Sequence, residues 1–353
     1  MSETFRLPAE WEAQGAVQLT WPHPRGDWED NLDPAQHCFA RIGAALSMDQ
    51  TLLCVVLDEA HEQRVRSLLR EQGAVLANCR FFRVPSEDSW ARDHGPLTVS
   101  GADGWSLLDF EFNGWGGRHP ARQDNAITTR LAELGAFGDT PLQRPGLTLE
   151  GGAIDTDGRG GFLIRQPTLV DARRNPGMNR EEIERALGHW LGARRIHWLH
   201  SGDLAGDDTD GHIDTLARFA PDNRILHQDC DDPRDPHYEP LKRMARELAE
   251  FRDADDKAPE RIALPLPAPV RDREGNRTPA GYANFLVTPR RVLMPAYKDP
   301  ADAVAARRIA AAFSGREVVP IDCRALVRQG GSLHCVTMQY PPGVVAAHRT
   351  DGA

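Results

Sequence analysis

The sequence predicts an α/β fold in which similar strand–helix–strand units of about 60 residues form a circular array. The first observation is that a strand, a helix and a second strand recur along the chain, each time followed by a polar segment. The second is spacing: 57 residues separate Asp93 from Glu150, 62 separate Glu150 from His212, and 123, close to twice 61, separate His212 from Cys335. Equal spacing is expected when each unit directs one segment toward a shared axis. The third is that no Gly/Ser-rich linker divides residues 1–353, which favours a single domain.

The first unit begins at residue 51. Residues 51–57 (TLLCVVL) are apolar and β-branched, which is typical of a strand. Residues 59–73 have apolar side chains at helical spacing and end at a glycine, a common helix stop signal. A second strand is predicted at 79–85, and the polar run SEDSWARDHGP follows it.

The second unit repeats this order. Residues 160–170 (GGFLIRQPTLV) are interpreted as strands, and 179–193 predict an amphipathic helix. Residues 195–200 predict a strand, after which the polar segment SGDLAGDDTDGHID begins. The unit therefore also ends in a segment rich in carboxylates.

The third unit lies near the C-terminus. Residues 284–295 predict a strand hairpin, 299–315 a helix and 316–322 a strand, and the segment GGSLHCVT follows. Equal spacing also predicts a further polar segment, or slot, that would face the shared axis near residue 273. This position lies within the loop-like stretch 253–279, where no catalytic-looking cluster is found.

The charge balance and the cysteines exclude several classes of protein. Forty-two Lys and Arg residues against 52 Asp and Glu give a net charge of −10, whereas nucleic-acid binding requires a basic face. No apolar run is long enough to cross a membrane, and the N-terminal stretch shows no secretory signal, so a cytoplasmic location is expected. The cysteines show neither CxxC pairs nor zinc-ligand spacing, which predicts free thiols and no metal site. They are Cys38, Cys54, Cys79, Cys230, Cys323 and Cys335.

The polar segments contain residue types that can carry out chemistry. Cys335 follows two glycines in GGSLHC, which permit close approach, although a buried structural cysteine is the ordinary alternative. His212 and Asp214 alternate, so on a strand they would share one face; an acidic surface turn is the alternative. Asp93 and Glu150 lie beside Gly or Pro, where a single carboxylate is more often a turn residue.

The combination of these residues is more informative than any one of them. A Cys and a His with one orienting carboxylate would suit protease-like acyl transfer. Several carboxylates around a thiol suit a planar cation better, because a guanidinium offers five N–H donors in a fixed fork and stays charged at ordinary pH. The sequence contains neither a phosphate-binding glycine loop nor a set of metal ligands beside these residues.

Six blocks of the sequence carry a family resemblance: WEAQGAVQLTWPHPRGDW, EDSWARDHGP, FEFNGWGG, LEGGAIDTDG, DGHIDTLARF and GGSLHCVTMQ. Together they closely resemble the agmatine deiminases, which belong to the bacterial-type peptidylarginine deiminase group of the guanidine-modifying superfamily. The matching blocks run from about Pro8 to Pro341, essentially the whole chain. The resemblance implies one deiminase domain over residues 1–353 with the pentein fold, a five-bladed α/β propeller with pseudo-fivefold repeats.

The resemblance also implies a role for each matching residue. Cys335 would be the nucleophile and His212 the general acid and base. Asp93 and Asp214 would grip the guanidinium, and Glu150 would orient His212 and the reacting group. Further substrate contacts are expected from Trp90 and Trp115, which would otherwise be ordinary core aromatics, and from Asp208, which would meet the far amine of agmatine.

The implied reaction is hydrolysis of agmatine to N-carbamoylputrescine and ammonia, within putrescine biosynthesis and without a metal or organic cofactor. The implied partner is a small-molecule guanidine, not nucleic acid or a membrane, and a homodimer is allowed. A deiminase of another guanidine, such as free or peptidyl arginine, is the alternative; a cysteine acyl hydrolase and a non-catalytic binding module are less favoured. The acidic run Asp203, Asp207, Asp208 and Asp210 favours an amine over a carboxylate at the far end of the site, and therefore agmatine.

Two departures from the family pattern concern the choice of substrate. Met338 stands where glutamine is common, and GGRHPARQDN replaces a longer aromatic segment after Trp115. Both are expected to affect the far end of the pocket. Arg92 and Arg118 are the only basic residues that the sequence places close to an active-site motif.

Overall fold

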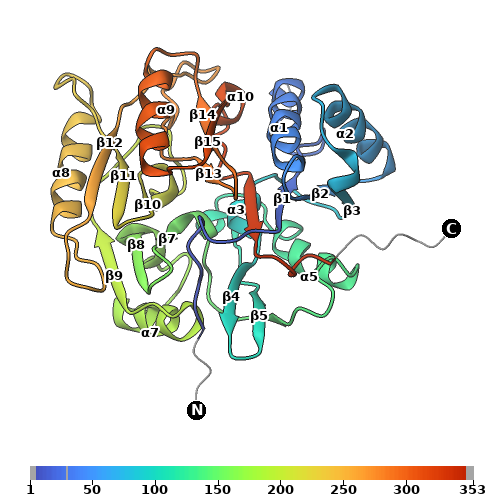
Figure 1. Ribbon diagram of the computed structural model, residues 1–353, viewed down its shortest axis with the longest axis horizontal. Coiled ribbons are helices and arrows are strands. Elements are labelled where there is room, and N and C mark those ends of the chain that lie inside the picture. Colours follow the sequence, from blue (N-terminus) through green and yellow to red (C-terminus); the bar gives the residue numbers. More distant parts are fainter. Residues whose placement is uncertain (1–4, 29–30, 347–353) are drawn as a thin grey trace.

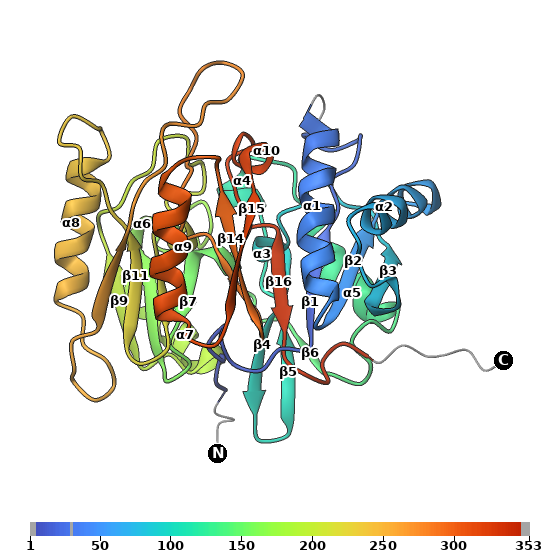
Figure 2. The same cartoon turned by 45° about the horizontal axis from the view of Figure 1, so that its top comes forward.

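The computed structural model describes residues 5–28 and 31–346, and it has an α/β architecture of small sheets with helices packed against them (Figures 1 and 2). The predicted α/β class is therefore confirmed. The strands are β1 (Ala16–Thr20), β2 (Thr51–Val56), β3 (Cys79–Arg83), β4 (Leu97–Gly101), β5 (Gly104–Leu108), β6 (Leu142–Gln143), β7 (Ile154–Thr156), β8 (Gly161–Arg165), β9 (Arg195–Leu199), β10 (Ala217–Ala220), β11 (Arg224–Gln228), β12 (Glu260–Leu264), β13 (Leu286–Val287), β14 (Arg291–Ala296), β15 (Glu317–Asp322) and β16 (Thr337–Tyr340). The helices are α1 (Leu32–Ser47), α2 (Glu59–Glu71), α3 (Ala91–His94), α4 (Gly114–Gly117), α5 (Ile127–Glu133), α6 (Gln166–Leu169), α7 (Arg180–Leu191), α8 (Tyr238–Ala249), α9 (Ala301–Ala312) and α10 (Arg324–Val327).

Across the described residues the strands form five separate sheets, in the orders β16-β1-β2-β3, β4-β5-β6, β7-β8-β9, β10-β11-β12 and β13-β14-β15. In each three-stranded sheet the first two strands are antiparallel and the last two are parallel. A parallel pair requires a crossover connection, and α5, α7, α8 and α9 lie in these crossovers. In the four-stranded sheet, β16 pairs antiparallel with β1, so strands from near the two ends of the chain share one sheet.

A polar connection leads from the last strand of each sheet to the first strand of the next sheet. The spacing argument predicted a fourth slot near residue 273 and found no cluster there. The connection between β12 and β13 does span residue 273, but it also contains Asn284, just before β13, which the sequence did not single out. The five connections contain, in chain order, Asp93, Glu150, His212, Asn284 and Cys335.

Helix α7 confirms the helix predicted at 179–193 and shows why it forms there. The side chain of Asn179 accepts a hydrogen bond from the backbone N–H of Glu182, and the Glu182 side chain accepts one from the Asn179 N–H. This capping box satisfies two N–H groups that the helix itself leaves unpaired. Gly192 ends the helix in the left-handed conformation, with φ +72°.

Two local predictions are wrong. The stretch 160–170 is only half strand: β8 ends at Arg165, and the one-turn helix α6, with a proline in its first turn, follows. His212 and Asp214 do not lie on a strand either. They flank and enter a single 3₁₀ turn, and β10 begins only at Ala217.

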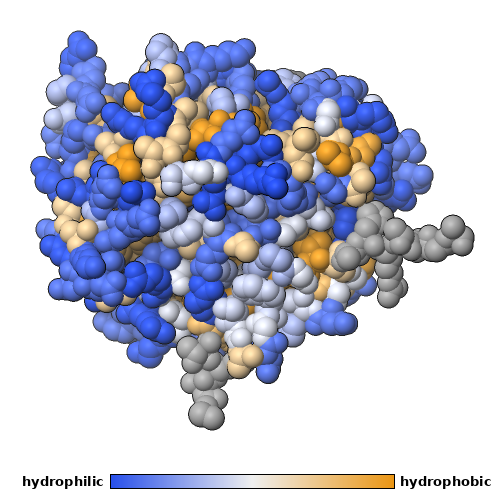
Figure 3. Space-filling view, in the orientation of Figure 1, coloured by the Kyte–Doolittle hydropathy of each residue, from blue (hydrophilic) through white to orange (hydrophobic). Residues whose placement is uncertain are grey.

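The core lies between the helices and the sheets, while the surface is mostly polar. The face drawn in Figure 3 is largely hydrophilic, with apolar side chains in small patches. Among the large apolar residues that the structure describes, Met48, Val75 and Leu134 are exposed. No helix in the described ranges is both long and apolar enough to cross a membrane.

Candidate active site

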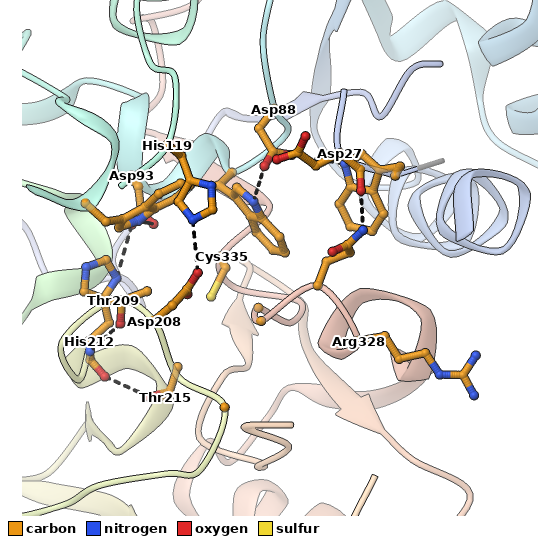
Figure 4. Close-up of a pocket in the computed structure, with 17 residues that line it drawn as sticks. Asp27, Asp88, Asp93, His119, Asp208, Thr209, His212, Thr215, Arg328 and Cys335 are labelled. Atoms are coloured by element: carbon orange, nitrogen blue, oxygen red, sulfur yellow. Dashed lines mark hydrogen bonds and ion pairs between the residues drawn. The ribbon is translucent and has the colours of Figure 1, made fainter. Parts of the chain in front are cut away.

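A pocket lies where several polar connections meet, and side chains from distant parts of the chain line it (Figure 4). Two predicted residues lie behind this lining: the Asp214 carboxylate is 3.7 Å from Cys335 Sγ, and the Glu150 carboxylate is 3.9 Å from His212 Nε2. The structure therefore brings all the predicted site residues to one place. Those that line the pocket are Trp90, Asp93, Trp115, Asp208, His212 and Cys335.

Cys335 lies in the connection that precedes β16 and is buried, with 6% of its surface exposed. Asn284 Nδ2 lies 3.2 Å from its Sγ, and Asn284 Oδ1 accepts a hydrogen bond from the backbone N–H of His334. Burial raises the pKa of the Cys335 thiol well above its usual value, and the charges of Asp214 and Asp93 raise it further. A cation bound between these carboxylates would oppose that rise.

Asp93 lies on the one-turn helix α3, and its carboxylate is held by neutral donors. Trp115 Nε1 donates to Oδ2 at 3.0 Å, and the backbone N–H of Gly152 donates to Oδ1 at 3.1 Å. Within the described part of the chain, no Lys or Arg lies within ion-pair distance of this carboxylate. Burial, together with the charges of Asp214 and Glu150, raises the pKa of Asp93 well above its ordinary value. A positively charged ligand would supply the missing counter-ion.

Gly152 lies so close to the site that a larger residue would disturb it. A Cβ atom on Gly152 would lie 2.6 Å from His212 Nδ1 and 2.8 Å from Asp93 Oδ1. Both distances are shorter than real carbon contacts allow. The second glycine of LEGGAIDTDG therefore serves close approach and the hydrogen bond to Asp93, not only a turn.

His212 is fully buried and contacts two carboxylates. Its Nδ1 is 3.5 Å from Asp93 Oδ1, and its Nε2 is 3.9 Å from Glu150 Oε2. Burial lowers the pKa of His212 to about 3, although the nearby Asp214 charge opposes this. The imidazole is therefore neutral at ordinary pH and can accept a proton.

Glu150 is paired with Arg174, which the sequence analysis did not single out. Arg174 Nε donates to both carboxylate oxygens of Glu150, and its Nη1 donates to Asp210 at 2.8 Å. Burial raises the pKa of Glu150, and the charge of Arg174 counteracts that rise. Arg174 follows Arg173 in the plain sequence DARRN, which contains no motif that would have indicated its role.

Aromatic side chains form one wall of the pocket. Trp90 Nε1 and Trp28 Nε1 donate to the two oxygens of Asp88, at 2.8 and 3.1 Å, which fixes both indoles. The Trp90 ring lies against the backbone at Gly331, where a Cβ atom would come within 2.2 Å of the ring. Gly331, the second glycine of GGSLHC, therefore makes room for this ring.

The acidic run before His212 does not produce an acidic far end, and that part of the sequence argument is wrong. Arg165 forms an ion pair with Asp203. Asp207 is hydrogen-bonded to Thr209 and to the backbone N–H of Gly211. Asp210 is paired with three arginines: Arg118, Arg173 and Arg174.

Asp208 is the member of this run that lines the pocket, and it already has a partner. His119 Nε2 lies 3.4 Å from the Asp208 carboxylate, and both side chains are partly exposed (Figure 4). Arg328 also lines the pocket, but its guanidinium points away from Cys335 (Figure 4). The position of His119 supports the expectation that the loop after Trp115 affects the far end of the pocket. The expectation that Arg92 and Arg118 are the only basic residues near the site is wrong, because Arg328 also lines the pocket.

Met338 does not lie where the sequence analysis placed it. It is buried in β16, and its Sδ is 3.8 Å from Arg92 Nη1. It is absent from the pocket lining, so its effect on the substrate can only be indirect. Arg92 is also absent from the pocket lining, and its Nη2 lies 3.6 Å from the Glu10 carboxylate.

The arrangement is suited to chemistry on a cation. A thiol and a neutral imidazole lie beside three buried carboxylates, and one of these, Asp93, has no cationic partner among the described side chains. Across the same residues, no group of three or more His, Cys, Asp or Glu side chains is arranged to hold a metal ion.

Comparison with known proteins agrees with this geometry. A family model described as Porphyromonas-type peptidyl-arginine deiminase matches residues 6–341. The chain is 33% identical to a Vibrio parahaemolyticus protein assigned provisionally as an agmatine deiminase, over 96% of this chain and 97% of that one. It is 30% identical to the agmatine deiminase of Pseudomonas fluorescens, with 96% of each chain covered.

Solved structures show the same fold. A Porphyromonas gingivalis protein, assigned provisionally as an arginine deiminase, is 44% identical and has a TM-score of 0.90, over 97% of this chain and all of that one. The C. jejuni agmatine deiminase with substrate bound is 31% identical and has a TM-score of 0.87, over 96% of each chain. An amidinotransferase from Microseira wollei, only 14% identical, shares the fold with a TM-score of 0.56 over 96% of this chain and 98% of that one.

Proposed function

Since this chain belongs to the Porphyromonas-type peptidyl-arginine deiminase family, we propose that it is a hydrolase that deiminates agmatine to N-carbamoylputrescine and ammonia. The observation that carries the proposal is the buried Asp93 carboxylate, held by neutral donors beside the Cys335 thiol and the neutral imidazole of His212. A guanidinium is the planar cation that would complete this site.

In the first step the guanidinium binds between Asp93 and Asp214. Its positive charge opposes the two carboxylate charges that raise the pKa of Cys335, so the thiol can pass its proton to the neutral His212. The thiolate then attacks the guanidinium carbon and forms a carbon–sulfur bond. The resulting tetrahedral adduct is neutral, because one negative and one positive charge have combined.

The second step breaks a carbon–nitrogen bond. The imidazolium of His212 protonates one nitrogen of the adduct, which leaves as ammonia, and a cationic amidino-thioether remains on Cys335. Glu150 lies 3.9 Å from His212 Nε2 and is positioned to orient the ring during this transfer. Arg174 holds Glu150 in place for that role.

The third step releases the product. Water attacks the amidino carbon while His212, neutral again, accepts a proton from it. The carbon–sulfur bond then breaks, the sulfur leaves as thiolate, and the hydroxyl becomes the carbonyl of a urea. The remaining proton is taken up by ammonia, so the overall reaction converts a guanidinium and water into a urea and ammonium.

Agmatine is the proposed substrate because Asp208 lines the mouth of the pocket and can receive its distant ammonium. Free arginine is the second candidate, since His119 beside Asp208 is a potential partner for a carboxylate. The 44% identity to the P. gingivalis protein, which is provisionally assigned as an arginine deiminase, also favours arginine as this second candidate. Trp90 and Trp115 would contact the alkyl chain of either substrate.

We also propose that the described residues form one domain with five blades around a shared axis. The support is the repeated sheet pattern, one polar connection between each pair of consecutive sheets, and the pairing of β16 with β1, which joins the last unit to the first. A cytoplasmic location remains an expectation from the sequence.

A panel of guanidines tests the proposal: agmatine, arginine, a peptidyl arginine and N-butylguanidine, each assayed for ammonia and for a ureido product. Asp93→Asn and Asp214→Asn should each cost about 2–4 kcal/mol of transition-state stabilisation, because each removes a charge from the guanidinium clamp. Asp109→Asn, a change at a buried carboxylate outside the pocket, is the matched control. Unchanged kinetics in both clamp variants would show that the guanidinium binds elsewhere.

A further inference from the structure

His334, the residue directly before Cys335, lies between two carboxylates that are far apart in sequence. Its Nδ1 is 2.7 Å from Asp214 Oδ2, and its Nε2 is 2.6 Å from Glu10 Oε2. All three side chains are buried. Because a carboxylate can only accept, two such contacts require both ring nitrogens to carry hydrogen, which is the imidazolium form.

The carboxylates on either side are in their charged forms. Burial raises the pKa of Asp214, but the hydrogen bond and the charge of His334 outweigh this, so that its pKa lies below its ordinary value. Burial likewise raises the pKa of Glu10, and the charges of Arg218 and His334 bring it far below the ordinary value. The ring therefore lies between two anions.

Glu10 is held in position by several contacts of its own, so it can fix the orientation of His334. Arg218 Nη2 donates to it at 2.9 Å, Arg92 Nη2 lies 3.6 Å away, and the backbone N–H of Val287 donates to its second oxygen at 2.7 Å. Arg218 is fixed in turn by Asp155, at 3.1 Å. Asp155, in β7, therefore belongs to this buried ionic cluster.

We propose that His334 is a positioning residue, held by Glu10 of the N-terminal segment, that fixes Asp214 as an ionised, oriented carboxylate facing Cys335. This inference rests on the proposed function, because Asp214 is one of the two carboxylates that would grip the guanidinium. His334 does not touch the substrate in this scheme. It acts through Asp214, which lies 3.7 Å from Cys335 Sγ.

The physical reason lies in the charges that surround Asp214. Asp93 and Cys335 face it from one side, and ionising all of these groups in a buried space is unfavourable without a nearby cation. Among the side chains that the structure describes, the cation in hydrogen-bond contact with Asp214 is His334. Removing that contact should leave Asp214 less ionised and less well oriented, and so a poorer partner for a cation.

Two substitutions separate the two contacts of His334. His334→Asn keeps an amide group near the position of Nδ1, where it can still donate to Asp214, but it cannot reach Glu10. His334→Gln places its amide near the position of Nε2, facing Glu10, and leaves Asp214 without the donor. Glu10→Gln keeps the shape and removes the charge of the remote anchor.

The readout is alkylation of Cys335 by two matched reagents, 2-chloroacetamidine, which carries a positive amidinium, and the neutral 2-chloroacetamide. The ratio of their second-order inactivation rates measures attraction of a cation to the site, whether or not the protein deiminates any substrate. We expect His334→Gln to lower this ratio about tenfold or more, as loss of a hydrogen bond to a charged group does, and His334→Asn to lower it less. The ratio in Glu10→Gln should lie between the ratios in His334→Asn and His334→Gln.

A purely structural role would lower the two alkylation rates together and leave the ratio unchanged. His227→Gln, at a buried histidine of β11 outside the pocket, controls for the loss of any buried imidazole. Thermal unfolding shows which variants fold. A ratio within threefold of the parent in folded His334→Gln overturns the proposal, and if that variant does not fold, the same result in Glu10→Gln overturns it.

The acid side of the kcat/KM profile gives a second readout. It should move to higher pH in His334→Gln than in the parent, because Asp214 must be ionised to bind the cation. The charged and titratable groups that face this cluster are Glu10, Arg92, Asp93, Asp155, His212, Arg218 and Cys335, and the substitution leaves all of them in place. An unmoved profile in active, folded His334→Gln counts against the proposal. If no guanidine is hydrolysed, the proposed function fails while the alkylation ratio still decides the role of His334.

Discussion

Arg174 donates from one nitrogen, Nε, to both carboxylate oxygens of Glu150, at 2.7 and 3.0 Å, and both side chains are completely buried. Its other nitrogens reach Asp210 and the backbone carbonyl of Thr209. The arginine thus connects the carboxylate beside His212 with the loop that precedes His212. A buried carboxylate that loses such a partner becomes costly to keep charged.

The first prediction concerns this pair. Arg174→Met should lower kcat/KM at least about a hundredfold and destabilise the fold by about 3–5 kcal/mol, because Glu150 is left buried without its cation. Arg173→Met is the matched control: Arg173 pairs with Asp171 and Asp210 but is half-exposed and does not contact Glu150. Steady-state kinetics and denaturant unfolding measure both effects. Equal losses in the two variants would show that the link to Glu150 is not the cause.

The second prediction concerns the nucleophile. Cys335→Ala should abolish ammonia release while thermal unfolding stays close to that of the parent, since the thiol is the proposed attacking group. Cys230→Ala, at another buried cysteine that lies outside the pocket, should retain activity. Mass spectrometry of the parent protein, quenched with acid during turnover, should detect an amidino adduct on Cys335. Near-parent activity in Cys335→Ala would contradict the mechanism.

The third prediction concerns Asn284, whose Nδ2 lies 3.2 Å from Cys335 Sγ. Asn284→Ala should reduce kcat/KM about tenfold, the loss of one hydrogen bond to a developing thiolate. Asn284→Asp has nearly the same shape but adds a negative charge beside the sulfur, which raises the thiol pKa further and should cost more. The rate of Cys335 alkylation by neutral chloroacetamide checks this order. If the aspartate variant reacts as fast as the parent, Asn284 does not stabilise the thiolate.

The fourth prediction concerns the substrate tail. Agmatine should have a kcat/KM at least about a hundredfold above that of arginine, a difference of about 2.7 kcal/mol. Asp208→Asn should narrow this gap by lowering kcat/KM for agmatine alone. His119→Asn should raise kcat/KM for agmatine several-fold, because it removes the group now paired with Asp208. N-butylguanidine, which lacks the amine, should respond to neither change. A preference for arginine in the parent would change the substrate and leave the deiminase chemistry in place.

The fifth prediction concerns pH. Burial lowers the pKa of His212 to about 3, and burial followed by the charges of Asp214 and Asp93 raises the pKa of Cys335. The free protein therefore holds a neutral imidazole and a neutral thiol, and the proton moves within this pair when the cation binds. Asp93 must also be ionised to bind the cation, and its pKa is raised, so we expect kcat/KM to fall as the pH drops below that pKa and to vary little with pH above it. A requirement for pre-formed thiolate would instead raise it about tenfold per pH unit, because the thiolate fraction grows below the raised pKa.

Features that depend on near neighbours in the chain could be predicted from the sequence. The helix at 179–193 follows from apolar periodicity and its capping residues, and the hairpin over 284–295 follows from two β-rich runs around a turn. The periodic spacing of polar segments indicated that they meet. Spacing pointed to the connection that spans residue 273, but Asn284 lies further along that connection and belongs to no recognisable motif, so it was missed.

By itself the sequence determined the α/β class, the repeated units and the candidate residues for chemistry on a guanidinium, because these depend on residue type and local pattern. Only the tertiary structure decided how charge is balanced. It joins Glu150 to Arg174 and Glu10 to His334, and it pairs Asp203 and Asp210 with arginines, which removes the acidic far end expected from the sequence. The reason is that ion pairs depend on distances of a few ångströms between segments that are remote along the chain. Those distances are fixed by the packing of the sheets and their connections, not by the order of residues within any one segment.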